Sequence, residues 1–162
     1  MFKAIAGIAA GLLALSGSAM AAAFINLASS DQQVATAANK PVAVTMSGAG
    51  AGFAVSGSKV TIAAAGDYFV FAAAQVGGSA AGNVYFWPRV NGKDVPDSNS
   101  VQNIPSAQFT TVLVSGGEMT FNAGDVLEFM YAASAPGLGL VASKPAGMPA
   151  VPSILFTAYK IN

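Results

Sequence analysis

After residue 21 the chain consists of short apolar runs separated by clusters of Gly, Pro, Ser and Asn. No segment in this part keeps the apolar spacing of about 3.6 residues that an amphipathic helix requires. Short apolar runs bounded by turn residues are typical of strands, so the pattern predicts an all-β protein. The expected strands are 40–46, 53–55, 59–62, 68–76, 83–90, 109–114, 119–121, 127–131 and 154–161.

Glycine marks the expected turns between these strands. Alternating Gly and Ala residues over 47–52 predict a flexible surface loop. The dipeptide Asn91-Gly92 directly follows the 83–90 strand. Because this dipeptide readily adopts the positive φ angles of a two-residue hairpin, we expect the chain to reverse there.

Two of the expected strands are apolar on both faces. In the 68–76 strand both alternate sets of side chains are apolar, although a half-solvated antiparallel strand should alternate apolar and polar residues. In the 83–90 strand one set contains Tyr85, Trp87 and Arg89, a mixture that is enriched at protein interfaces. The pattern predicts a β-sandwich in which one sheet packs a core inward and a neighbouring subunit outward. A helix covering that sheet is the alternative, but no helical stretch is available after residue 40.

The amino terminus has the features of a secretory leader. One positive charge precedes an apolar run, and the small residues Ala19 and Ala21 then match the pattern that signal peptidase accepts. We therefore expect a hydrophobic signal helix over 1–21, with cleavage before Ala22. An uncleaved membrane anchor over 4–25 is the alternative, since that stretch is long enough to span a bilayer with some tilt, although it is rich in Ala and Gly.

The composition excludes several kinds of chemistry. The 162 residues include no His and no Cys, so a thiol nucleophile, an imidazole base, a Cys/His zinc site and a disulfide framework are all absent. Seven Lys and Arg against seven Asp and Glu give no basic surface for nucleic acid. Only 9% of the residues are charged, against about 25% in ordinary soluble domains. We expect a protein that is not an enzyme and that buries much of its uncharged surface.

Two groups of oxygen-bearing side chains are candidates for other chemistry. Asp67 and Asp125 each follow a Gly at a strand entrance, and a glycosidase would need them about 5 to 9 Å apart in a cleft. Accepting backbone N–H groups in a turn is the commoner role of such Asp residues. Asp94, Asp97 and Asn99 follow the expected hairpin and could offer ligands to calcium, but their spacing matches no dedicated loop. We expect no cofactor, with calcium in this loop as the alternative.

Four motifs occur in order over nearly all of 31–162. They are Gly66-Asp67-Tyr68-Phe69-Val70-Phe71, Arg89-Val90-Asn91-Gly92, Phe121-Asn122-Ala123-Gly124-Asp125-Val126-Leu127 and Ser153-Ile154-Leu155-Phe156-Thr157-Ala158-Tyr159-Lys160-Ile161. In this order they resemble the motifs of the tumour-necrosis-factor/complement component-1q-like jelly-roll family, most closely its bacterial and phage members. The counterparts are a Gly-x-Tyr-x-Phe strand, a strand ending in Asn-Gly, a Leu-x-Ala-Gly-Asp-x-Val turn and an apolar final strand.

The resemblance implies a two-sheet antiparallel jelly roll of ten strands over 41–162, preceded by an arm or first strand over 22–40. It also implies compact homotrimers with aromatic residues near the three-fold axis, and a role in recognition or structure rather than in catalysis. The chain departs from the family in lacking a collagen-like stalk and a clear counterpart of the acidic metal-binding residues of some members. The candidate trimer-interface residues are Tyr68, Phe69, Phe71, Tyr85, Trp87 and Tyr159.

These features together predict a secreted or surface-displayed trimer that builds or decorates an extracellular assembly, such as a surface layer, a filament, an appendage tip or a virion exterior. Its expected partner is itself, with no nucleic acid and, once the leader is removed, no membrane. The alternative is the ligand-recognition head of an adhesin or virion spike, which would bind glycan or protein through loops 77–82 and 135–152 or stack sugar on Trp87. The Gly, Ala and Pro content of these loops favours spacers over binding sites.

Overall fold

The computed structural model describes residues 23–162, so the expected signal helix and the cleavage site at Ala22 lie outside the described residues. Within 23–162, no helix has the length and apolar character needed to cross a membrane. The strands are β1 (Phe24–Ser29), β2 (Gln33–Val34), β3 (Val42–Ala43), β4 (Ser47–Ala51), β5 (Phe53–Ser56), β6 (Lys59–Ile62), β7 (Gly66–Gly78), β8 (Gly82–Val90), β9 (Lys93–Asp94), β10 (Ser100–Ile104), β11 (Thr110–Phe121), β12 (Val126–Ala133), β13 (Leu138–Leu140) and β14 (Ile154–Lys160).

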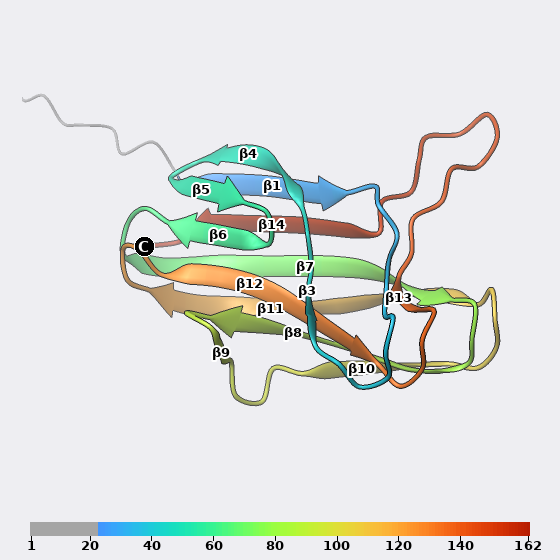
Figure 1. The fold of residues 1–162 in the computed structure, drawn as a ribbon. Coiled ribbons are helices and arrows are strands. Elements are labelled where there is room, and N and C mark those ends of the chain that lie inside the picture. The colour runs from blue at the N-terminus through green and yellow to red at the C-terminus, as the bar shows by residue number, and fades with distance from the viewer. Residues whose placement is uncertain (1–22) are drawn as a thin grey trace, which may run out of the picture.

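These strands form two seven-stranded antiparallel sheets (Figure 1). Sheet A has the order β2-β13-β7-β14-β1-β4, with β11 along the other edge of β7. Sheet B has the order β10-β8-β12-β6-β5, with β3 beside β12 and β9 beside β8. The prediction of an all-β, two-sheet antiparallel fold is confirmed. Of the fourteen strands, β1 and β2 lie within 22–40, where an arm or first strand was expected, and the other twelve lie within 41–162, where ten were expected. Four of the fourteen, β2, β3, β9 and β13, have only two or three residues each.

The central strand β7 is apolar on both faces, and the two faces have different surroundings. It pairs with β11 along one edge and with β14 and β13 along the other. Tyr68, Val70 and Ala72 point into the sandwich and are at most 1% exposed. Phe69 and Phe71 alternate with them and therefore lie on the outer face of sheet A, where they are half-buried. The inner face belongs to the core, and the outer face is left at the surface of the chain.

Aromatic side chains from both sheets join in the core. Phe86 and Phe129 of sheet B stack with ring centroids 5.2 Å apart. Phe129 also meets Phe156 of sheet A at 5.4 Å. Within sheet A, the rings of Tyr68 and Phe121 meet edge to face with centroids 5.7 Å apart. Such offset and edge-to-face pairs are the favoured aromatic geometries, so these rings fix how the two sheets sit on one another.

The hairpin expected at Asn91-Gly92 is confirmed. β8 and β9 pair on either side of these two residues, whose φ angles are 51° and 76°. The Asn91 side chain also holds the next turn, because its Nδ2 donates to Asp125 Oδ1 at 2.8 Å and its Oδ1 accepts from Val126 N at 2.9 Å. Two turns that are far apart in the sequence are thereby joined at one end of sheet B.

The strand expected over 40–46 is shorter than predicted, because only β3 (Val42–Ala43) forms there. The reason lies in Gln33, whose side-chain amide takes the place of a neighbouring strand. Its Oε1 accepts from Thr45 N at 2.8 Å and its Nε2 donates to Thr45 O at 3.0 Å. A side chain that satisfies both backbone groups removes the need for a ladder at that residue.

The flexible loop expected over 47–52 is also wrong, because 47–51 is the edge strand β4 beside β1. Its glycines serve close packing. A Cβ added at Gly48 would collide with the backbone oxygen of Asn26, and one added at Gly50 would collide with that of Phe24. Glycine occurs at these positions because β4 packs so closely against β1 that no side chain fits on that face.

The strands expected at 109–114 and 119–121 form one continuous strand, β11. Gly116 and Gly117, which indicate a break in the sequence, instead pair in register with Phe71 and Val70 of β7. Four further strands, β2, β9, β10 and β13, were not expected from the sequence pattern. They are short and polar or glycine-containing, and they are recruited by neighbouring strands rather than by a periodic pattern of their own.

Candidate functional site

The outer face of sheet A is the most distinctive surface of the described residues. Strands β1, β14, β7 and β11 lie next to one another and each sends alternate side chains outward. We call this surface the apolar face. Its residues are Phe24, Phe69, Phe71, Ala73, Val112, Val114, Leu155, Thr157 and Tyr159.

Strand register places these side chains in rows across the sheet. In one row Phe24, Tyr159 and Phe69 are successive neighbours, and the rings of Phe69 and Tyr159 have centroids 5.4 Å apart. In another row Leu155 lies beside Ala73. Cross-strand neighbours of this kind support one another. Between these rows Asn26 is the neighbour of Thr157, so the face is largely apolar, with uncharged polar side chains in one row.

Much of this surface remains accessible in the single chain. Phe24 is 51% exposed, Val112 57% and Leu155 53%. Of the nine large apolar residues that are exposed within 23–162, five belong to the apolar face. Exposed apolar residues are normal when scattered, but a contiguous patch on a soluble protein marks a surface that binds something.

Charge on sheet A lies toward one end of this face. Glu118 neighbours Phe69 in register, and Asp67 lies one pair further along β7. The carboxylate of Asp67 accepts a hydrogen bond from Thr120 Oγ1 at 2.6 Å. The centre of the face therefore offers no ionised group for a polar ligand, and its chemistry is that of apolar packing.

The outer face of sheet B is different, because the chain already covers its aromatic residues. Trp87, Met130 and Ala132 form a small buried cluster of their own, with Ala43 and Tyr85 packed against it. Trp87 is only 8% exposed, so little of its ring is left for the sugar-stacking platform that the sequence allows. On this face Val101 of β10 is the large apolar side chain that stays exposed within 23–162, at 56%.

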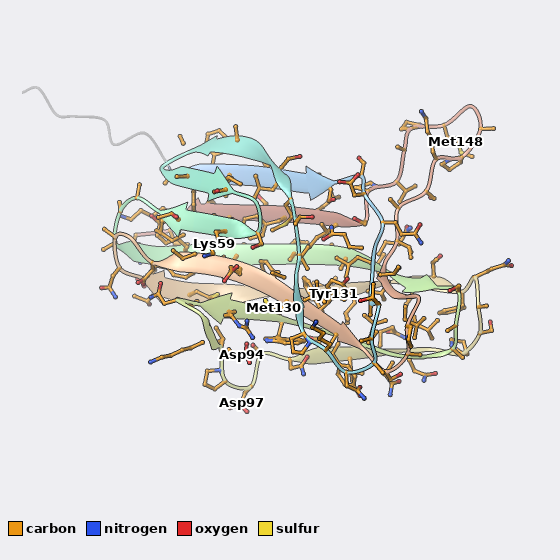
Figure 2. All side chains as sticks on the ribbon, in the orientation of Figure 1. Lys59, Asp94, Asp97, Met130, Tyr131 and Met148 are labelled. Carbon is orange, nitrogen blue, oxygen red and sulfur yellow. The ribbon has the colours of Figure 1, made fainter. Side chains whose placement is uncertain are left out.

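Asp94 fixes the polar edge of the Trp87 cluster. Its Oδ1 accepts from Trp87 Nε1 at 2.7 Å and from Arg89 Nε at 2.8 Å. The hydrogen bond from Arg89, followed by that from Trp87, lowers the pKa of Asp94 below its ordinary value. The indole N–H and the Arg89 Nε–H therefore both have a hydrogen-bond acceptor within the chain. Figure 2 shows Asp94 and Asp97 on the loop beneath sheet B.

The six predicted interface residues do not share one surface. Phe69, Phe71 and Tyr159 lie on the apolar face. Tyr85 and Trp87 belong to the outer side of sheet B. The sixth, Tyr68, points into the core.

Tyr68 is 0% exposed, and its hydroxyl donates to Ala64 O at 2.7 Å. Burial raises the pKa of this hydroxyl. Tyr68 is therefore a core residue whose hydroxyl is hydrogen-bonded within the chain. The outward-facing residues next along the same strand are Phe69 and Phe71.

The sequence interpretation missed Phe24, Val112, Val114 and Leu155 as members of the apolar face. A signal was present, since Val112 and Val114 alternate with inward-pointing residues of the same strand. Period alone, however, does not tell which alternate set faces the core. The register of β11 on β7 and of β14 on β1 decides it.

The two Asp residues considered as a catalytic pair stand on different sheets. Asp67 lies at the start of β7 in sheet A, whereas Asp125 precedes β12 in sheet B. Asp125 accepts from Asn91 Nδ2 at 2.8 Å and from Asn122 N at 2.8 Å, and these bonds, Asn91 first, lower its pKa. Within residues 23–162, no three acidic side chains gather as a metal site would require.

The fold and this surface together define the class of the chain: an antiparallel two-sheet jelly roll with one uncovered apolar face. No protein-family profile and no curated protein matches the sequence. Among solved structures, murine APRIL at pH 5.0 has a TM-score of 0.63 at 13% identity, over 87% of this chain and 100% of that one. Structures of murine APRIL at pH 8.0 and pH 8.5 each have a TM-score of 0.61 at 12% identity, with the same coverage. The chain thus has a tumour-necrosis-factor-like jelly-roll fold.

Proposed function

We propose that the protein is a non-enzymatic homotrimer that associates through the apolar face and builds or decorates an extracellular assembly. The observation that carries the proposal is the contrast between the two outer faces. Sheet B has its aromatic cluster covered by the chain itself, whereas sheet A leaves Phe24, Val112, Leu155 and their neighbours half-exposed. A second copy of an equally apolar surface is the partner that this chemistry fits.

The energetic argument for association rests on the exposed apolar residues. Complete burial of one large apolar side chain contributes about 1.5 to 3 kcal/mol. Covering the exposed halves of five such side chains would therefore contribute on the order of 5 kcal/mol per protomer before the cost of ordering. Charge opposes this little, because Lys, Arg, Asp and Glu make up only 9% of the chain.

The number of copies follows from the resemblance to the tumour-necrosis-factor/complement component-1q-like family, whose heads are trimers. The bacterial or phage origin that the four motifs suggest is part of the same proposal. A closed ring also agrees with the way most soluble oligomers bury such surfaces. No cofactor is needed for this role.

Export is the second part of the proposal. The leader over 1–21, with Ala19 and Ala21 before the cleavage point, would direct the protein outside the cytoplasm, to the cell surface or into a virion. β1 begins at Phe24, so a chain that starts at Ala22 keeps the whole strand. Cleavage at this position would therefore leave sheet A intact.

Multi-angle light scattering on the chain that begins at Ala22 tests the association. We expect one species with three times the mass of a single chain at micromolar concentration. A stable monomer over the same concentration range would contradict the proposal. Mass spectrometry of the natural amino terminus tests export separately, with Ala22 expected as the first residue.

A further inference from the structure

A small hollow opens at the end of the apolar face that lies farthest from Asp67. It is lined by Ala73, Gln75, Val112, Val151, Pro152 and Leu155. The one amide among them is already engaged, because Gln75 Nε2 donates to Val141 O at 2.8 Å. The hollow therefore presents an apolar lining with no free polar group placed to orient a ligand.

The size of the hollow narrows what it can hold. Its volume is about 120 Å³. Pockets for drug-sized molecules and cofactors occupy roughly 300 to 1,000 Å³, so such a ligand is excluded. Water is a poor occupant as well, because a buried water needs about two to four polar partners and this lining is apolar. One apolar side chain is the occupant that fits both its volume and its chemistry.

The same chain carries an exposed apolar side chain on a projecting segment. Residues 142–152, which we call the arm, leave the sandwich after β13 and return before β14. Ser143 and Val151 hold its base together through two hydrogen bonds of 3.0 and 2.8 Å. Met148 lies near the tip, stands clear of both sheets and is 64% exposed (Figure 2).

The arm cannot fill the hollow of its own chain. Val151 and Pro152 at its base form part of the hollow's wall, whereas Met148 lies on the far side of the Ser143 bridge. Pro145, one of three prolines in the arm, also accepts a hydrogen bond from Met148 N at 3.4 Å, which shapes the tip. Folding back would require breaking the bridge. The arm therefore leaves the hollow of its own chain open.

We propose that Met148 of one copy inserts into the hollow of the neighbouring copy, which locks the register of the assembly. The inference rests on the proposed function, because it needs copies that meet on the apolar face. Met is suited to this role, since its unbranched, polarisable side chain adapts to irregular apolar gaps. A projection on one copy and a recess on the next form a heterologous contact, and such contacts close into rings when the rotation permits.

Methionine oxidation tests the insertion. The mature protein is treated with dilute hydrogen peroxide, and sulfoxide at each Met is followed by peptide mass spectrometry. An inserted thioether is shielded, so Met148 should oxidise at least about fivefold more slowly in the assembled protein than in a monomeric Val112→Lys variant. Met130, which is 4% exposed in a single chain, is the internal control and should stay slow in both.

A variant that fills the hollow provides the second measurement. Ala73→Leu should leave no room for the neighbour's thioether and raise the oxidation rate of Met148 toward that of the monomer. Because Ala73 belongs to the apolar face, light scattering on the same sample separates displacement of the thioether from loss of the trimer. Ala146→Leu adds the same side chain to an exposed position of the arm and should leave Met148 shielded.

The outcomes separate the two proposals. A trimer by light scattering in which Met148 oxidises as fast as in the monomer overturns the insertion and leaves the proposed function standing. A monomeric wild-type protein overturns the proposed function, and the insertion with it. A trimer with shielded Met148 that Ala73→Leu exposes supports both.

Discussion

Single residues in this chain derive their roles from partners that are distant in sequence. Gln33 ends a strand by binding the backbone of Thr45, and Asn91 joins its own hairpin to the turn at Asp125. The indole N–H of Trp87 is not free for a ligand, because it donates to Asp94 Oδ1. In each case the residue type is typical of a turn or an interface, and its actual role follows from the group opposite it.

The pair of Trp87 and Asp94 makes a prediction about pH. Hydrogen bonds from Arg89 and Trp87 lower the pKa of Asp94 below its ordinary 3.8 in the folded protein. The stabilising effect of this carboxylate is therefore present above the ordinary Asp range and is lost as the pH falls through the lower, folded-state pKa. Trp87 is the single tryptophan, so its fluorescence should change with a midpoint below pH 3.8.

The fluorescence titration is followed together with far-UV circular dichroism, which separates a local change from unfolding. Asp94→Asn should remove the transition. Asp97→Asn changes an exposed carboxylate of the same loop and should keep it. An unchanged transition in Asp94→Asn would show that another group is responsible.

At the scale of elements, some glycines allow two strands to pack closely, whereas others have open space around them. Gly48 and Gly50 let β4 lie against β1, and Gly116 lets β11 lie against β7. Gly117, next to it, has open space where a Cβ would stand. The same residue type in the same kind of strand therefore has opposite tolerance to substitution, which depends on the neighbour's backbone.

Paired glycine substitutions test this reading of the strands. Gly50→Ala should destabilise the protein by about 1 to 3 kcal/mol, because the added Cβ meets backbone atoms of β1 that cannot move aside. Gly117→Ala should be neutral or slightly stabilising, since the Cβ enters open space and the unfolded chain loses freedom. Urea denaturation of both variants measures the difference. Equal losses of stability would contradict the close approach of β4 to β1.

The whole molecule is a sandwich whose two outer faces have opposite fates. β3 and the loop at Asp94 cover the aromatic cluster of sheet B, whereas the described residues of the chain leave the centre of the outer face of sheet A uncovered. The outer face of sheet A therefore carries the uncharged side chains that a partner would bury.

Matched lysine substitutions test which face associates. Val112 on the apolar face and Val101 on β10 of sheet B are 57% and 56% exposed, so a lysine should be equally tolerated by either fold. Val112→Lys should give a monomer, because association would bury its charge in an apolar contact. Val101→Lys should remain a trimer. Light scattering gives the mass, and the reverse pattern would move the interface to sheet B.

The sequence by itself determined the all-β class, most of the long strands and the hairpin at Asn91. These follow from local rules, since periodicity, turn residues and φ preferences act over a few neighbouring residues. The structure decided which alternate set faces the core, that Tyr68 lies inside, that 47–51 is a strand, and that Phe24, Val112 and Leu155 share a face with Phe69. Such facts depend on register between strands that lie up to 135 residues apart, as for Phe24 and Tyr159, and a shift of one residue would turn every side chain to the other face.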